Sequence, residues 1–372
     1  MRATEFLDLA WRLKRGSITR RHFLGASGLA TAMAALGLRP GPARAGEIGD
    51  RVGLCTWPSY HDPANLAAFE AATGAAVALT VFGSNEEMLA KLQAGAAGFD
   101  VMVPSNFAIP DYVGLGLLRP LDAALLPHHD PAQHEPRFLD AGLVDGRLYG
   151  VPKNWGHSGF VYDSRALAER PTTWREFWDL ARGPLDGRVL VNDYQITTVG
   201  FALKYFGHSF NSLDPAELAE AERLLLAVKP HLFGITSDYK PLLLAGEAAA
   251  SICWSGDGLQ LRRENPALTY EIGREGGEIW ADYYCVPADA PNPAGAHALI
   301  DFLTTPAVTA REVLAHGYAP TDARAVALLP EALKVDPILF PAAELLTPLE
   351  FGTAGVLIDP LRNELFARFK AA

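Results

Sequence analysis

The sequence predicts an α/β fold made of two lobes, and three observations lead to this prediction. Strands and helices alternate along the chain with short connections, which is the pattern of mostly parallel sheets covered by helices. This alternation occurs in two blocks, and the second begins after Val151-Pro152. The 327 residues that follow an N-terminal export signal also suit two domains better than one.

The first block contains three predicted strands and two predicted helices. The first helix begins at Asp62-Pro63, an N-cap residue followed by proline at the first helical position. The second begins with Ser84-Asn85-Glu86-Glu87, which has the spacing of a capping box. The predicted strands are Gly53–Thr56, Val77–Phe82 and Asp100–Val103.

The second block repeats this alternation with its own helix-start signals. Thr173-Trp174-Arg175-Glu176 is another capping box, and Asp214-Pro215 starts a helix that reaches about Val228. The remaining predicted elements are strands at Gly187–Asn192, Ala249–Trp254 and Glu278–Val286, then helices at Ala294–Leu303 and Ala307–His316.

The chain is expected to pass between the two lobes near 152–157 and again near 278–282. We therefore assign residues 46–153 and 282–320 to lobe 1, and residues 154–281 and 321–372 to lobe 2. Because ligands of open α/β sheets gather at the carboxyl ends of strands, the candidate binding residues are those that directly follow the predicted strands. We expect them to line a cleft between the lobes.

Residues 1–45 have the features of a cleavable export signal rather than of folded protein. Arg20-Arg21 is a twin-arginine pair that precedes a weakly apolar stretch, Phe23–Leu38, too short for a stable membrane span. Ala43-Arg44-Ala45 is a small-x-small cleavage site. We expect export of the folded chain by the twin-arginine (Tat) machinery and cleavage after Ala45.

The charge of the mature chain excludes one class of partner. The signal holds eight of the 32 Lys and Arg and two of the 43 Asp and Glu, so 24 basic and 41 acidic residues remain, a net charge of −17. Nucleic acid is not an expected partner, because phosphate binding needs clustered positive charge. A negative field raises the local concentration of a cationic solute, although acidity alone also keeps a secreted protein soluble.

Three cysteines, Cys55, Cys253 and Cys285, show neither metal-ligand spacing nor a CxxC motif. In an oxidising compartment one pair can form a disulfide, and Cys253 with Cys285 is the preferred pair because both fall in predicted strands of the second block. The alternative, that all three are buried and reduced, is equally compatible with the sequence.

Aromatic and small polar residues follow five of the predicted strands. Tryptophan and tyrosine faces attract a cation, and a carboxylate accepts a charge-assisted hydrogen bond from it, so this combination is typical of ammonium recognition. A single tryptophan is more often part of a core, but three at separate strand ends favour a binding site. The residues are Trp57 with Tyr60, Ser105 with Phe107, Asn192-Asp193-Tyr194, Trp254 with Ser255, and Trp280 with Asp282.

Several motifs, in their order and spacing, resemble the periplasmic spermidine/putrescine-binding proteins of polyamine ABC importers. The likeness covers nearly all of the mature chain. It rests on Trp57-Pro58-Ser59-Tyr60, Ser84–Leu92, Phe99–Ser105, Val151–Gly156 and Trp280–Tyr283. The resemblance implies a two-lobe, type II periplasmic-binding-protein fold that closes on its ligand and delivers it to an inner-membrane ABC permease. It implies a monomeric periplasmic protein, not an enzyme, with neither cofactor nor metal.

The resemblance also implies a role for each candidate residue. Asp282 would hold an amine, Ser105 would form a hydrogen bond, and Phe107 takes the place of a tyrosine. Aromatic walls would come from Trp57, Tyr60, Tyr194, Trp254 and Trp280.

This chain departs from the family pattern at up to three carboxylates. Ser59 stands where polyamine binders have a glutamate, and Tyr194 and Thr197 fall where they have two acids, although Asp193 is adjacent. Burying an unpaired ammonium group costs several kcal/mol, so a site with few acids disfavours a long polyamine. The expected ligand is a polyamine or another small amine-bearing solute, cationic or zwitterionic.

Two other functions were weighed against solute binding. A ferric-ion-binding protein of the same fold uses adjacent tyrosines, and Tyr283-Tyr284 is such a pair, but strand alternation points the two side chains to opposite faces. An exported enzyme is disfavoured because the sequence has no GxSxG, HExxH or P-loop motif. Solute binding is the function that the sequence predicts.

Overall fold

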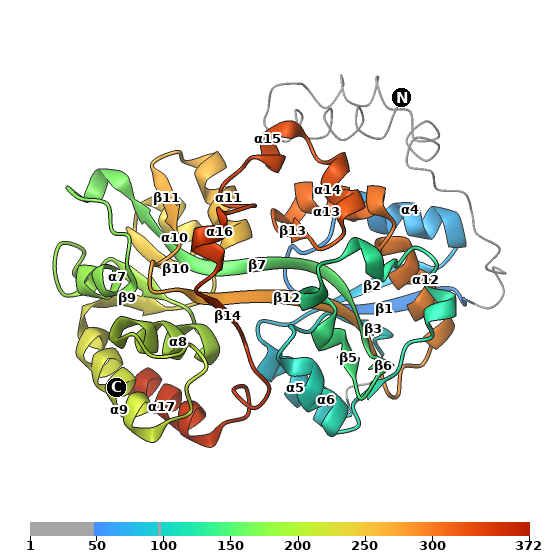
Figure 1. Ribbon diagram of the computed structural model, residues 1–372, viewed down its shortest axis with the longest axis horizontal. Helices are drawn as coiled ribbons and strands as arrows, with labels where there is room; N and C mark the ends of the chain where they lie inside the picture. The colour runs from blue at the N-terminus through green and yellow to red at the C-terminus, as the bar shows by residue number, and fades with distance from the viewer. Residues whose placement is uncertain (1–47, 96–97) are drawn as a thin grey trace. The chain divides into compact units, whose positions relative to one another are not determined.

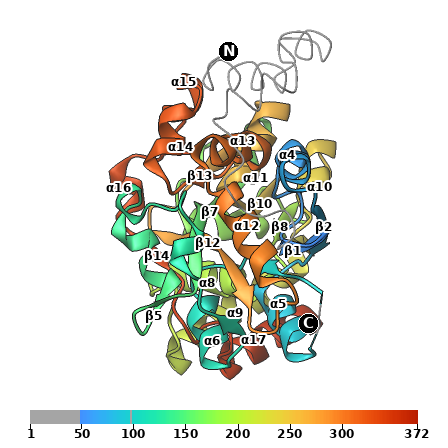
Figure 2. The same cartoon turned by 90° about the vertical axis from the view of Figure 1, so that its right-hand side faces the viewer.

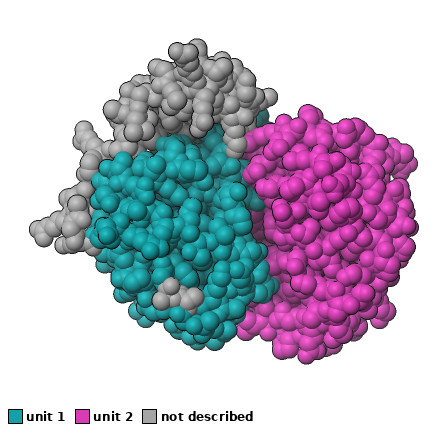
Figure 3. Space-filling view, turned by 180° about the vertical axis from the view of Figure 1, so that it is seen from behind, with its two compact units in different colours: residues 1–155, 281–336 teal, residues 156–280, 337–372 magenta. Residues whose placement is uncertain are grey.

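The computed structural model describes residues 48–95 and 98–372, so the predicted export signal at 1–45 lies outside the described residues. The chain divides into two compact units. Unit 1 comprises residues up to Trp155 together with Ala281–Asp336, and unit 2 comprises Gly156–Trp280 with Pro337–Ala372, as coloured in Figure 3. Two long strands, β7 (Gly150–Asp163) and β12 (Gly277–Pro287), contribute residues to both units.

Unit 1 is an α/β unit, as predicted. Its other strands are β1 (Arg51–Thr56), β2 (Ala76–Val81), β3 (Val101–Met102), β4 (Leu118–Arg119), β5 (Leu143–Val144), β6 (Arg147–Leu148) and β13 (Ala319–Pro320). Its α-helices are α4 (Pro63–Thr73), α5 (Asn85–Gln93), α6 (Ala108–Gly114), α12 (Pro293–Leu303), α13 (Pro306–His316), α14 (Ala323–Leu328) and α15 (Glu331–Lys334).

The centre of unit 1 is a parallel sheet edged by antiparallel strands. β1 pairs in parallel with β2 on one side and with β3 on the other. β12 continues the sheet antiparallel to β3, with Cys285 opposite Met102. Figure 1 shows α4, α12 and α13 on one side of this sheet and α5 and α6 on the other. The ends of β1 and β3 therefore lie at the same sheet edge.

Local sequence signals determine where the unit 1 helices begin and end. The Asp62 side chain accepts a hydrogen bond from the Ala64 amide at the start of α4, and Gly74 ends that helix in the left-handed conformation, with φ of 79°. Ser84 accepts a bond from the Glu87 amide at the start of α5. Glu87 bonds the Gly83 amide rather than that of Ser84, so the predicted capping box is only half formed.

Unit 2 is also an α/β unit. Its other strands are β8 (Val189–Val191), β9 (Leu232–Ile235), β10 (Ala250–Trp254), β11 (Leu268–Glu271) and β14 (Leu349–Phe351). Its α-helices are α7 (Trp174–Ala181), α8 (Gln195–Phe206), α9 (Pro215–Val228), α10 (Lys240–Ala245), α11 (Ser255–Glu264), α16 (Ala343–Leu346) and α17 (Pro360–Ala371).

The sheet of unit 2 repeats the plan of unit 1. β10, β8 and β9 run parallel, and β7 pairs antiparallel with both β10 and β11. Helices α8, α9 and α17 lie together on one side, and α10 and α11 lie beside β10 and β11, as Figures 1 and 2 show. The capping box predicted at Thr173 is complete, with both reciprocal bonds to Glu176.

A cluster of aromatic rings fills the core of unit 2. Trp174 is fully buried and stacks on Phe201, with 3.7 Å between ring centroids and an angle of 16° between planes. Its indole N–H donates to the carbonyl oxygen of Gly276 at 2.8 Å. Phe160 and Phe177 pack against the same ring. Trp174, the first residue of α7, therefore contacts three other segments of unit 2.

The structure corrects the predicted boundary near the C-terminus. Residues 321–336 belong to unit 1, whereas we had assigned all of 321–372 to lobe 2. The reason is tertiary packing: α14 contacts both α13 and β13. Arg324 also donates a hydrogen bond to the carbonyl oxygen of His128, 2.7 Å away in unit 1.

The preferred disulfide is absent. Cys55, Cys253 and Cys285 are all free and buried, as the alternative reading of the sequence allowed. Burial raises the pKa of the Cys55 thiol to about 11. Such thiols behave as small apolar side chains rather than as nucleophiles.

One further finding concerns membranes. None of the helices within 48–95 and 98–372 combines the length and the apolar character that a membrane span requires.

We predict that Trp174→Ala lowers the free energy of unfolding by about 3–5 kcal/mol. The substitution leaves a large cavity among stacked rings and removes the hydrogen-bond donor of the Gly276 carbonyl oxygen. Urea unfolding followed by circular dichroism measures this loss. Leu226→Ala, at a side chain of unit 2 that is 39% exposed, is the control and should cost about 0.5 kcal/mol. Equal losses in the two variants would contradict the proposed core role of Trp174.

Candidate functional site

The candidate residues of unit 1 lie at the ends of neighbouring strands. Tyr60 follows β1, Ser105 follows β3, and Asp282 lies on β12, the next strand of the sheet. Ser105 and Asp282 face one another in an isolated antiparallel bridge. Strand order therefore brings together three side chains that are far apart in sequence.

Asp282 is the centre of this group. Its carboxylate is buried, at 3% exposure, and each oxygen accepts from a hydroxyl group. Ser105 Oγ donates to Asp282 Oδ1 at 2.7 Å, and the Tyr60 hydroxyl lies 2.5 Å from Asp282 Oδ2. The Tyr60 hydroxyl is also 2.8 Å from Asn154 Oδ1 on β7. Asp282 is thus held by neutral donors, and among the described residues of unit 1 its carboxylate has no direct ionic partner.

A second layer of hydrogen bonds orients Ser105. Asn85, the first residue of α5, accepts from the Ser105 amide with Oδ1 and donates to Ser105 Oγ with Nδ2, both at 3.2 Å. The Tyr112 hydroxyl donates in turn to the Asn85 carbonyl oxygen at 2.8 Å. Asn85 and Tyr112 are both fully buried, so the serine hydroxyl has little freedom to turn away from Asp282.

Burial dominates the electrostatics of Asp282. It raises the pKa of the carboxyl to about 6, against the opposing effects of the Tyr60 and Ser105 hydrogen bonds and of the Lys153 charge. The group is ionised at neutral pH and protonated in mild acid. A cation that approached it would find a carboxylate with weak solvent screening, where charge-assisted hydrogen bonds are strong.

A buried ion cluster lies on the other side of Tyr60. Lys153 Nζ is 3.8 Å from Glu312 Oε2, and it donates to the Tyr60 carbonyl oxygen at 3.2 Å. Glu312 also faces His61 Nδ1 at 3.0 Å and accepts from Asn65 at 2.6 Å. Burial lowers the pKa of Lys153 to about 8, with Glu312 and Asp282 opposing, so the ammonium stays charged at neutral pH.

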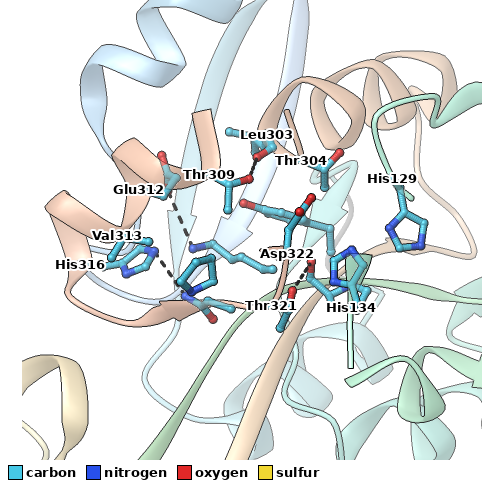
Figure 4. A pocket seen from close by; sticks show the side chains of 15 residues that line it. His129, His134, Leu303, Thr304, Thr309, Glu312, Val313, His316, Thr321 and Asp322 are labelled. Carbon is cyan, nitrogen blue, oxygen red and sulfur yellow. Dashed lines mark hydrogen bonds and ion pairs between the residues drawn. The ribbon is translucent and has the colours of Figure 1, made fainter. Parts of the chain in front are cut away.

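A small pocket of unit 1 borders this cluster. Figure 4 shows Glu312 and His316, from α13, on one side of it and His129 and His134 on the other. The rings of His129 and His134 lie 5.2 Å apart, and burial lowers the pKa of His129 to about 4. Burial lowers the pKa of both histidines, and the lysine of this pocket already pairs with Glu312, so the pocket is not a site for an anion and is not the candidate site.

The two other unit 1 candidates lie beside the Asp282 group. The Trp57 indole N–H donates to the Val103 carbonyl oxygen at 3.0 Å, which ties the ends of β1 and β3 together, and its ring packs 4.5 Å from that of Phe82. Trp57 remains partly exposed. Phe107 is only 2% exposed at the start of α6, so its ring belongs to the core of unit 1.

The candidates of unit 2 form an aromatic group of their own. The rings of Tyr194 and Trp254 lie 6.5 Å apart, and Tyr239 lies 6.0 Å from Trp254 on β10. Trp280 packs on the backbone of Gly156, where an added Cβ would lie 2.5 Å from the indole and 2.9 Å from Ser255 Oγ. Glycine at 156 is therefore required for the tryptophan to take this position.

Two acids near this aromatic group already have basic partners. Asp257 pairs with Lys240 at 2.7 Å and accepts from the Tyr239 hydroxyl at 2.7 Å. Asp193 pairs with Lys370 at 2.6 Å on the surface. Thr197 cannot replace a carboxylate, because its hydroxyl donates to the Tyr194 carbonyl oxygen inside α8.

Several members of these groups could not be identified as site residues from the sequence. Asn85 had been noted only as part of a helix start, and Lys153 and Asn154 only as part of a family motif. Glu312 lies within the predicted helix Ala307–His316, with nothing in the local pattern to mark it as buried. Tyr239 precedes a short helix, α10, that was not predicted. Proximity to strand ends could have identified Asn85 and Asn154, but not Glu312.

The structure does not favour the alternative of a ferric-ion-binding protein. The Tyr283 hydroxyl donates to the Phe138 carbonyl oxygen at 2.8 Å, and Tyr284 stacks on His61. Among residues 48–95 and 98–372, no three His, Cys, Asp or Glu side chains gather in a way that could hold a metal ion.

Comparison with known proteins points to one family. The profile of the bacterial extracellular solute-binding proteins matches residues 64–341. A putrescine/agmatine-binding protein of Pseudomonas aeruginosa is 30% identical over 345 residues, covering 86% of this chain and 91% of that protein. Spermidine/putrescine-binding periplasmic protein 1 of Haemophilus influenzae is 29% identical over 301 residues, covering 80% and 82%.

A solved structure supports the same relationship. The spermidine/putrescine ABC transporter substrate-binding protein of Streptococcus pneumoniae superposes with a TM-score of 0.72 at 27% identity, covering 87% of this chain and 99% of that one. The predicted fold class, a two-lobe α/β fold of the type II periplasmic binding proteins, is confirmed.

We predict that Ser105→Ala raises the pKa of Asp282 further above about 6, because the serine hydroxyl stabilises the ionised carboxylate. Carbon-detected NMR titration of the aspartate carboxyl groups measures the change. Ser164→Ala, at an exposed serine of unit 2, should leave the Asp282 titration as it is. An unchanged pKa in Ser105→Ala would show that this hydrogen bond is not formed in solution.

Proposed function

This chain belongs to the bacterial extracellular solute-binding proteins, and we propose that the solute it captures for its ABC importer carries an ammonium group held by Asp282. The observation that carries this proposal is the buried carboxylate of Asp282, which accepts hydrogen bonds from the neutral hydroxyls of Tyr60 and Ser105. Each carboxylate oxygen can accept further bonds, and an ammonium group supplies both the donors and the missing positive charge.

Aromatic side chains are the second part of the proposal. Trp254 and Trp280 in unit 2 and Trp57 in unit 1 would provide ring faces for the cation or apolar walls for its carbon chain. Tyr194 stands beside Trp254 and would contribute in the same way. The relatives compared above are named for putrescine, spermidine and agmatine, all of which are organic cations.

The proposed mechanism is reversible capture without chemical change. The chain passes between the units at 155–156, 280–281 and 336–337, and these positions are the proposed hinge. Ligand would bind one unit first and then favour closure, since a ligand shifts such an equilibrium only through contacts that it makes in the closed state alone. Capture of this kind requires neither a cofactor nor a metal.

The proposal includes the route by which the protein reaches the periplasm. The compared relative from Haemophilus influenzae is periplasmic. The Arg20-Arg21 pair and the Ala43-Arg44-Ala45 site support export by the twin-arginine pathway, after which the protein would act as a monomer.

We predict that Asp282→Asn weakens binding of the amine by about 2–4 kcal/mol, the cost of leaving a buried charge without its partner. A thermal-shift screen of diamines, monoamines, betaines and amino acids identifies the probe, and isothermal titration calorimetry gives its affinity. Asp186→Asn removes the same charge from the surface of unit 2, where Asp186 pairs with His231, and should change the affinity little. Unchanged affinity in Asp282→Asn would place the solute elsewhere.

We predict that affinity for the same probe falls about tenfold between pH 7 and pH 5, because Asp282, with its pKa of about 6, becomes protonated and neutral. Lys153 and Glu312 keep their charges over this range. The pKa of Lys153 is about 8. Burial raises the pKa of Glu312, but His61, Lys153 and Asn65 outweigh this effect, so its pKa is lowered overall. The Asp282→Asn protein should lose this pH dependence. A pH-independent affinity in the unmodified protein would contradict the role of Asp282.

A further inference from the structure

Lys153 lies against the ring of Tyr60, one of the candidate residues. Its Nζ lies 4.0 Å from the centroid of the Tyr60 ring, within the range of a cation–π contact. The same ring carries the hydroxyl that reaches Asp282. One face of Tyr60, expected from the sequence to serve as a wall for a cationic ligand, is thus covered by a cation that belongs to the protein.

The charges around Asp282 in unit 1 sum to a single negative charge at neutral pH. Asp282 and Glu312 each contribute one negative charge, and Lys153 contributes one positive charge. His61 faces Glu312 but stays neutral, because burial lowers the pKa of its ring. All four side chains are buried, so water screens their fields weakly. One ammonium group therefore neutralises the net charge of this cluster. A second ammonium group would be repelled by the positive charge of Lys153.

In unit 2, two acids near the candidate aromatics are each paired with a lysine. Lys240 neutralises Asp257 close to Trp254, and Lys370 neutralises Asp193 next to Tyr194. Neither Asp257 nor Asp193 therefore offers an uncompensated charge to a second ammonium group.

We propose that Lys153 is a specificity-determining residue, which restricts the site to solutes with one ammonium group and rejects those with two. This inference rests on the proposed function, because it assumes that the solute binds at Asp282. A protein cation fixed beside the binding carboxylate acts by repulsion, and specificity commonly depends on such an unfavourable element as well as on favourable contacts.

Three probes with the same four-carbon chain test the proposal. Putrescine carries two ammonium groups, n-butylamine carries one, and 4-aminobutyrate carries one together with a carboxylate. Calorimetry at pH 7 should show tighter binding of n-butylamine or 4-aminobutyrate than of putrescine. The measured quantity is the ratio of the affinity for putrescine to the affinity for the better one-ammonium probe. In Lys153→Met this ratio should rise about tenfold or more, which is equivalent to about 1.4 kcal/mol.

Matched variants separate local charge from other effects. Lys153→Met/Glu312→Gln restores the single negative charge and should return the preference to within about threefold of the unmodified protein. Lys334→Met removes the same charge from the surface of unit 1, where Lys334 pairs with Glu331, and should leave the preference unchanged. If circular dichroism shows that Lys153→Met does not fold, Lys153→Gln is used in its place.

Each outcome decides between the two proposals. If Asp282→Asn abolishes binding but Lys153→Met leaves the preference unchanged, the solute does bind at Asp282 and the specificity role of Lys153 is wrong. If putrescine binds the unmodified protein more tightly than both one-ammonium probes, the specificity role is also wrong. If all three probes bind and Asp282→Asn affects none, both proposals fail, as they do if no probe binds any of these proteins.

Discussion

The contact on which the account depends is the buried carboxylate of Asp282 between two hydroxyl groups. Removing a carboxylate from water is costly, and here the cost is offset by Tyr60 and Ser105 rather than by a direct salt bridge. The strand order of unit 1 makes this possible, because β1, β3 and β12 lie side by side. A sheet edge that gathers donors around one acid leaves that acid ready for a cation from outside.

Internal lysines set the limits of this site. Two carboxylates near the candidate aromatics of unit 2 are neutralised by lysines of the same unit, Asp257 by Lys240 and Asp193 by Lys370. In unit 1, Lys153 pairs with Glu312 and influences Asp282 only through its field. This distribution differs from what several ammonium groups require, since each would need its own buried acid. The placement of a few charged side chains can therefore adapt the same fold to bind a smaller cation.

Much of the fold, and part of the site, could be predicted from local sequence. Residues such as Asp62 and Thr173 show where helices begin, because a cap depends only on its near neighbours. Ser105 could be identified because it follows a strand of the parallel sheet, and Asp282 because it belongs to the family motif Trp280–Tyr283, since β12 itself runs antiparallel to β3. Lys153 could not, because its burial depends on Glu312, which approaches it only in the folded chain. Residues 321–336 were assigned to the wrong lobe for the same reason, since packing on α13 decides their place.

The most direct test of the account is a crystal structure of the protein with its natural solute, purified from the periplasm of the source cells. We predict that an ammonium nitrogen of that solute lies within about 3 Å of an Asp282 carboxylate oxygen, as in charge-assisted hydrogen bonds. We further expect the Tyr60 and Ser105 hydroxyls to remain on the carboxylate. A solute without a positively charged nitrogen, or one bound with Asp282 still unoccupied, would contradict the central claim.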